Sequence, residues 1–157
     1  MCGGKRSEGF TLVEVLVSVL ILGIGLLGLA GLQNIGAAAG YSALQRSQAS
    51  WLASEMADLL RANPDAAHAG AYDTNFVDAA AGCPKGGGST RAQLDLGEWL
   101  EHVCETLGGT GSGSVQVIRS DDLYSASIAV RWNDRRARER LGEAGSAWET
   151  FTYRAGL

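Results

Sequence analysis

The chain has 157 residues, of which 46% are hydrophobic, and a formal net charge of −4 at pH 7. This length supports one modest hydrophobic core rather than two. The acidic balance disfavours nucleic acid as a partner for the whole surface, so we expect no nucleic acid to bind.

A long apolar segment follows a short basic leader. Lys5 and Arg6 precede it, Glu14 lies near its start, and no further charged residue occurs before Arg46. About 20 apolar residues suffice to cross the hydrocarbon core of a membrane as a helix. We therefore expect a transmembrane helix over about residues 10–32. The positive-inside tendency places the N-terminus in the cytoplasm and the remaining chain outside.

Two ordinary explanations of this segment leave Glu14 without a role. A cleaved secretory signal has an apolar core of about 7 to 15 residues, and this segment is longer and carries an acid. A plain signal anchor explains the length and the orientation. However, a carboxylate near the centre of a membrane helix costs about 2.5 to 3.5 kcal/mol, and less near an end. This cost favours a function for Glu14.

The residues around Glu14 form a recognisable motif. After the basic leader, the sequence from Gly9 to Glu14 is GFTLVE. This motif resembles the prepilin signature of type IV pilins and of type II secretion pseudopilins. The Leu- and Gly-rich run that ends in LAGLQ is most similar to the minor pilins called type IV pilus modification protein PilV. The resemblance is strong over about residues 9–62 and weaker afterwards, apart from the region around Trp132.

The resemblance implies how the N-terminus is processed. A membrane-embedded prepilin peptidase would cut after Gly9 and methylate the new N-terminus at Phe10. Glu14, the fifth residue of the mature chain, would then pair with the N-terminal amine of a neighbouring subunit. Glycine suits the cleavage site because it has no side chain to crowd the scissile bond.

The same resemblance implies where the protein acts. It would be anchored in the inner membrane with a periplasmic domain and then enter a pilus. Its partners would be the prepilin peptidase, the major pilin and other minor pilins, with a pilus-tip adhesin as a further partner. Its role would be to prime assembly or to join the tip complex. The alternatives are a minor pseudopilin of type II secretion and a membrane-tethered binding domain that does not assemble.

The first predicted element is a single helix. No proline occurs between Phe10 and Ala62, and Asn63–Pro64 would end the helix. Its later part, about residues 44–62, has apolar residues at helical spacing and charged residues between them. We assign Trp51 and Met56 on this part to core packing. The predicted organisation is thus a leader (1–9), a helix (10–62) and a globular domain (63–157).

The rest of the chain predicts an α+β, pilin-like fold. Residues 65–91 are rich in Ala and Gly and predict a loop. A second helix is expected to start at Asp95, which has capping-box spacing to Glu98, and to stop at Gly108. Alternating patterns predict strands over residues 114–119, 123–132 and 148–154. We expect the long helix to pack on this antiparallel sheet of about three strands, with one extra short helix.

Two cysteines predict a disulfide in the globular domain. Cys2 leaves with the leader, and Cys83 and Cys104 would then lie in a compartment that permits disulfides. A metal site is the alternative, because His68 and His102 are also present. Their spacing matches no CxxC or HxxxH pattern, so we expect no metal and no cofactor. Neither histidine lies in a recognisable catalytic motif, so we do not expect an enzyme.

One basic cluster stands out in this acidic protein. It lies between the second and third predicted strands and consists of Arg135, Arg136, Arg138 and Arg140. One interpretation is a contact with an acidic patch on a neighbouring pilin or on a tip adhesin. The other is a solvated connection or short helix in which Glu139 and Glu143 neutralise the nearby arginines.

Overall fold

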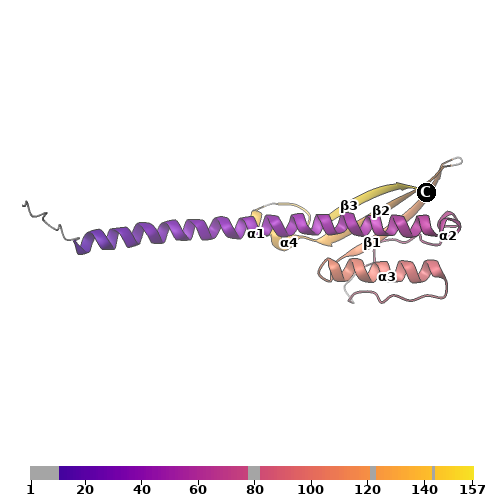
Figure 1. Ribbon diagram of the computed structural model, residues 1–157, viewed down its shortest axis with the longest axis horizontal. Coiled ribbons are helices and arrows are strands. Elements are labelled where there is room, and N and C mark those ends of the chain that lie inside the picture. Colours follow the sequence, from indigo (N-terminus) through magenta and orange to yellow (C-terminus); the bar gives the residue numbers. More distant parts are fainter. Residues whose placement is uncertain (1–10, 78–81, 121–122, 143) are drawn as a thin grey trace, which may run out of the picture. The chain divides into compact units, whose positions relative to one another are not determined.

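The computed structural model describes residues 11–77, 82–120, 123–142 and 144–157. Contacts divide the chain into two compact units, Met1–Ala37 and Ala38–Leu157, which are described separately below. The elements in chain order are α1 (Leu12–Ala62), α2 (Pro64–His68), α3 (Arg91–Thr106), β1 (Ser112–Ser120), β2 (Leu123–Asn133), α4 (Arg135–Leu141) and β3 (Trp148–Gly156) (Figure 1).

The predicted α+β fold is confirmed. The strands form one antiparallel sheet in the order β1-β2-β3. Ile128 in the central strand is paired with Val115 on one side and Tyr153 on the other. Every second residue of β2, from Ala126 to Trp132, is buried, as expected for a sheet with one face on the core. The loop prediction for residues 65–91 is wrong at its start, where α2 lies, because Pro64 suits the first turn of a helix. Helix α4 lies where a short helix was one of the two interpretations.

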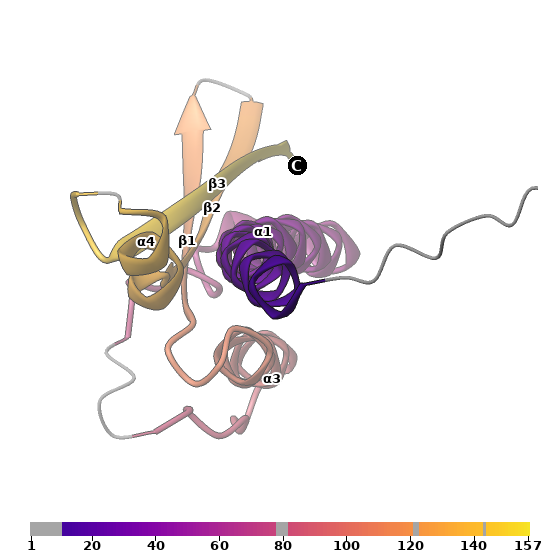
Figure 2. The ribbon, with the colours of Figure 1, turned by 90° about the vertical axis from the view of Figure 1, so that its left-hand side faces the viewer.

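Helix α1 packs on this sheet through the part that belongs to the second unit. Its buried residues recur every three or four positions and are Ala38, Ser42, Gln45, Ala49, Leu52, Ala53, Met56, Ala57 and Leu60. Figure 2 shows α1 end-on, with the sheet on one side and α3 next to it. Met56 is fully buried, as predicted, but Trp51 is 58% exposed. The core assignment of Trp51 is therefore wrong, because position 51 lies outside the row that faces the sheet.

Trp99 is one of two tryptophans buried in the core, with Trp132. It is 1% exposed, and its indole Nε1 donates a hydrogen bond to the backbone carbonyl of Leu52, 2.8 Å away. This bond joins α3 to α1. The ring lies against Gly113 in β1, where a Cβ atom would overlap it. Glycine is needed at this position because the ring occupies the space of a side chain.

Helix α3 starts four residues earlier than predicted. The hydroxyl of Thr90 accepts the backbone N–H of Gln93 (3.3 Å), and the Gln93 amide oxygen accepts that of Thr90 (3.4 Å). These bonds form a capping box ahead of Asp95. Asp95 itself is buried, and its carboxylate accepts the Tyr72 hydroxyl (2.9 Å) and pairs with Arg91 (2.8 Å). The predicted start at Asp95 was wrong because this carboxylate serves tertiary contacts instead of capping.

The predicted disulfide between Cys83 and Cys104 is present. It fastens the loop before α3 to the buried face of that helix. The loop also donates a hydrogen bond from the Gly86 N–H to the Glu101 carboxylate, at 2.8 Å. Closing a loop of about 20 residues contributes about 3 kcal/mol of stability by restricting the unfolded chain.

Candidate functional site

The candidate site is the start of α1, where Thr11 caps the helix. The backbone N–H of Glu14 lies 3.3 Å from the Thr11 hydroxyl and 3.1 Å from the Thr11 carbonyl. The Ser18 hydroxyl donates to the Glu14 carbonyl at 2.7 Å. Sequence reasoning missed Thr11, although Thr-x-x-Glu is itself a capping-box pattern. Gly9 and Phe10 lie outside the described residues, so the cleavage site stays a prediction.

Glu14 is the single charged side chain among the described residues of the first unit, 11–37. It lies in the first turn of α1 and is exposed. A carboxylate in the first turn interacts favourably with the partial positive charge of the helix N-terminus. The position therefore suits an acid locally, and its outward exposure leaves it able to pair with a cation.

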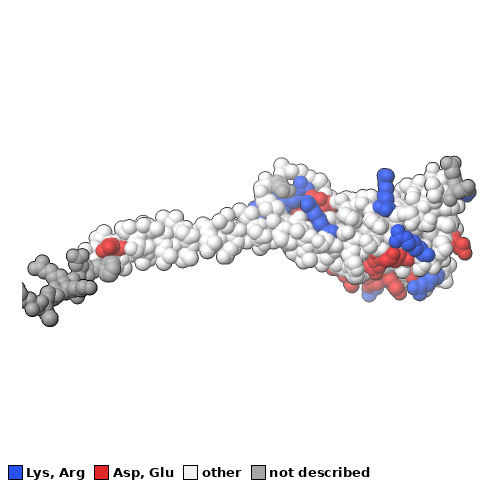
Figure 3. Space-filling view, turned by 45° about the horizontal axis from the view of Figure 1, so that its top comes forward, with Lys and Arg blue, Asp and Glu red and all other residues white. Residues whose placement is uncertain are grey.

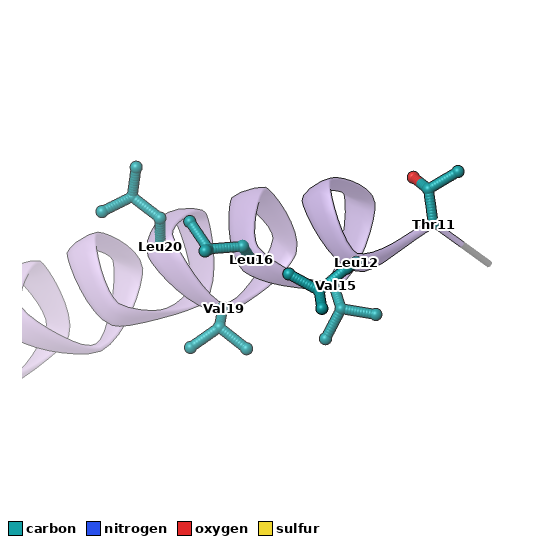
Figure 4. Close-up of a pocket in the computed structure, with 6 residues that line it drawn as sticks. All are labelled: Thr11, Leu12, Val15, Leu16, Val19 and Leu20. Atoms are coloured by element: carbon teal, nitrogen blue, oxygen red, sulfur yellow. The ribbon is translucent and has the colours of Figure 1, made fainter.

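The rest of this unit presents an apolar surface. Exposed fractions of its large apolar side chains range from 46% at Val17 to 81% at Leu12. Figure 4 shows one open groove on this surface, lined by Thr11, Leu12, Val15, Leu16, Val19 and Leu20. At 100° per residue, Glu14 points away from this row. Such a surface can be covered by lipid or by another apolar helix.

By length and composition, α1 is able to cross a membrane. Its apolar window has a mean hydropathy of 2.6, and none of that window is buried within the protein. A core helix of a soluble domain would bury this stretch. The transmembrane segment over about residues 10–32 stays a prediction.

The basic cluster forms the short helix α4. The Arg135 side chain pairs with Glu139 at 2.6 Å. Arg138 turns inward, where it contacts the Ser146 carbonyl and the Glu149 carboxylate, both at 2.9 Å. Arg136 and Arg140 are exposed. The structure thus separates Arg138 from the other three, and a contact between these arginines and a partner stays a prediction.

The two histidines have separate neighbours. His68 at the end of α2 stacks on the Tyr124 ring, with centroids 3.7 Å apart. His102 in α3 places its Nδ1 atom 3.2 Å from a Glu55 carboxylate oxygen, and the edge of its ring meets Trp51. Within the ranges that the structure describes, no three His, Cys, Asp or Glu side chains are grouped to hold a metal ion.

Comparison with known protein families gives a match that covers the candidate site. The family described as Prokaryotic N-terminal methylation motif matches residues 4–30, a range that contains Gly9, Phe10 and Glu14. No curated protein matches the chain, and no solved structure does. The matched motif implies processing by prepilin peptidase in a membrane context related to pili. Together with the exposed apolar helix, it supports a type IV pilin-like protein that is anchored in the membrane.

Proposed function

We propose that this chain is a minor pilin of the type IV pilus, of the PilV type, which primes pilus assembly or joins the tip complex. One observation carries the proposal. Every Leu, Ile and Val from Leu12 to Ile35 is exposed, and Glu14 is the one charged residue in that stretch. A surface of this kind needs lipid or neighbouring helices to cover it.

The proposed function has two stages. The peptidase would cut after Gly9 and methylate Phe10 while the helix lies in the inner membrane. In the filament, the apolar helices of other pilins would replace the lipid around α1. The Glu14 carboxylate would then pair with the N-terminal amine of a neighbour. In a low dielectric, an unpaired member of this pair costs several kcal/mol, so the pair would select one register between subunits.

We propose a structural role and no catalysis. Both histidines have neighbours that explain them without a substrate, since His68 stacks on Tyr124 and His102 pairs with Glu55. Asp95, a buried acid, is bonded to Tyr72 and Arg91. These contacts support folding.

Deleting the gene should separate a pilus role from a secretion role. We expect fewer surface pili, because a priming subunit would be missing, and unchanged release of type II secretion substrates. Mass spectrometry of sheared pili from the parent strain should detect the chain at far below the amount of the major pilin. Re-expression of the full chain is the control. Normal pili together with lost secretion would instead identify a minor pseudopilin.

A further inference from the structure

Helix α4 is fixed to the first turns of α1 in the second unit. Just before α4, the buried carboxylate of Asp134 accepts a hydrogen bond from the Ser42 hydroxyl at 2.6 Å. In β3, which follows α4, the Glu149 Oε1 atom lies 3.7 Å from Nη2 of Arg46 and 2.9 Å from Nη1 of Arg138. Both ends of the connection are therefore held to α1, and Figure 1 shows α4 beside this part of the helix.

This attachment lies close to the predicted membrane span along the chain. Ser42 follows Leu32, where the span is expected to end, by ten residues, and none of the residues between them is charged. Ten residues of helix rise by about 15 Å, of which the headgroup layer on that side of the bilayer takes up about 5 to 8 Å. Along the chain, the α4 region is therefore attached to α1 near the start of the second unit, ten residues of helix beyond the predicted span.

Burial separates the charges around α4. The sequence from Asp134 to Glu149 contains four arginines and four acids, so its charges sum to zero. However, Asp134 is 4% exposed and the Glu149 side chain 23% exposed, whereas the Arg135 side chain is 70% exposed. Arg136 and Arg140 are exposed and form no ion pair with a described residue. Among the described residues, the outer surface carries Arg135, Arg136 and Arg140 against one exposed acid, Glu139, which pairs with Arg135, so it is more basic than the sequence of the segment.

We infer that the outward arginines of α4, Arg135, Arg136 and Arg140, bind the anionic phosphate headgroups of the membrane that holds α1. The inference rests on one part of the proposed function, which is that α1 spans the bilayer. Basic residues next to a membrane anchor are attracted to anionic lipids within about a Debye length, about 10 Å at 0.1 M salt. Arginine also matches phosphate with a planar pair of donors.

A nearby aromatic side chain agrees with this occupant. Trp148, at the start of β3, is 42% exposed, and its neighbour Ala147 accepts a hydrogen bond from the N–H of Asp134. Tryptophan is enriched where proteins meet the membrane–water interface. Figure 3 shows blue basic side chains beside a smaller red acidic area at one end of the globular unit. Headgroups therefore fit both the charge and the place of this surface.

The inference can be tested on the full chain in lipid vesicles. Cys2→Ser with Ala144→Cys would allow one fluorophore to be attached beside α4, with an acceptor dye in the lipid. Energy transfer should rise when phosphatidylglycerol is added to phosphatidylcholine and should fall in high salt. R136Q/R140Q should lower the ratio of membrane-bound to free α4 about 30-fold, because each basic residue near the membrane surface raises this ratio about fivefold. R136K/R140K should retain most of the binding.

A matched pair of arginines controls for net charge. R119Q/R154Q removes two arginines from the other end of the sheet and should leave energy transfer unchanged. If the chain floats with the vesicles but its energy transfer does not change with phosphatidylglycerol or salt, the inference is overturned and the proposed function is not. The inference is also overturned if R136Q/R140Q keeps its energy transfer but no longer co-purifies with other minor pilins. That result would show that this surface binds protein. A chain that does not float with vesicles would instead contradict the proposed function.

Discussion

Glu14→Val should keep the chain in the membrane and largely exclude it from filaments. Valine lowers the cost of inserting α1, because a carboxylate disfavours a membrane helix. It also removes the partner of the neighbouring amine, which would then be unpaired in a low dielectric at a cost of several kcal/mol. Since 1.4 kcal/mol corresponds to a factor of ten, incorporation should fall at least tenfold.

The measurement is the amount of the variant in membranes and in sheared pili, by immunoblotting. Ser18→Ala is a suitable control, because it alters the same side of α1 one turn later and removes only the hydroxyl bonded to the Glu14 carbonyl. It should enter filaments normally. Normal incorporation of Glu14→Val would show that the carboxylate is not needed for assembly.

Trp99→Ala should strongly destabilise the globular unit, and Trp51→Ala should not. Trp99 is 1% exposed, packs on Gly113 and donates to the Leu52 carbonyl, so truncation leaves a cavity and removes this hydrogen bond between α3 and α1. Removing a buried tryptophan side chain costs about 3 to 5 kcal/mol. Trp51 is 58% exposed, and a substitution at such a position usually changes stability by about 0.5 kcal/mol or less.

Urea unfolding of the full chain in detergent, followed by near-ultraviolet circular dichroism, would compare the two variants. The pair is matched because both remove the same side chain, one from the core and one from the surface of α1. Equal losses of unfolding free energy would contradict the packing described here. Full stability of Trp99→Ala would contradict it as well.

Much of the fold was predictable because its signals are local. Alternation located the three strands within a few residues, and the absence of proline predicted a helix that ends at Ala62. The signal for α2 was also present, since Pro64 is well suited to the first turn of a helix. The Ala- and Gly-rich composition from residue 65 nevertheless favours a loop, which is wrong for the residues of α2.

The errors arise where distant residues decide the outcome. Asp95 has capping-box spacing to Glu98, but its carboxylate contacts Tyr72, and Thr90 caps α3 instead. The contact of Trp99 with Gly113 depends on how α3 packs against β1. No local sequence pattern predicts this packing. Tertiary structure also separates Arg138 from the rest of its cluster, through Glu149.

The candidate site was more accessible to sequence reasoning than the packing. An acid in an apolar helix is costly inside a membrane, so Glu14 stands out in a membrane-length segment without any knowledge of the fold. Its capping residue, Thr11, was recognisable from the same six residues. A partner surface leaves no comparable local signal, because it depends on which side chains the fold turns outward.

The most direct test is the N-terminal sequence and intact mass of the protein from membranes of cells with and without prepilin peptidase. With the peptidase, we expect a mature chain that begins at methylated Phe10. Without it, we expect the uncut chain with its leader. A chain that keeps its leader in both strains, or that is cut elsewhere, would contradict the proposal that this protein is a processed pilin.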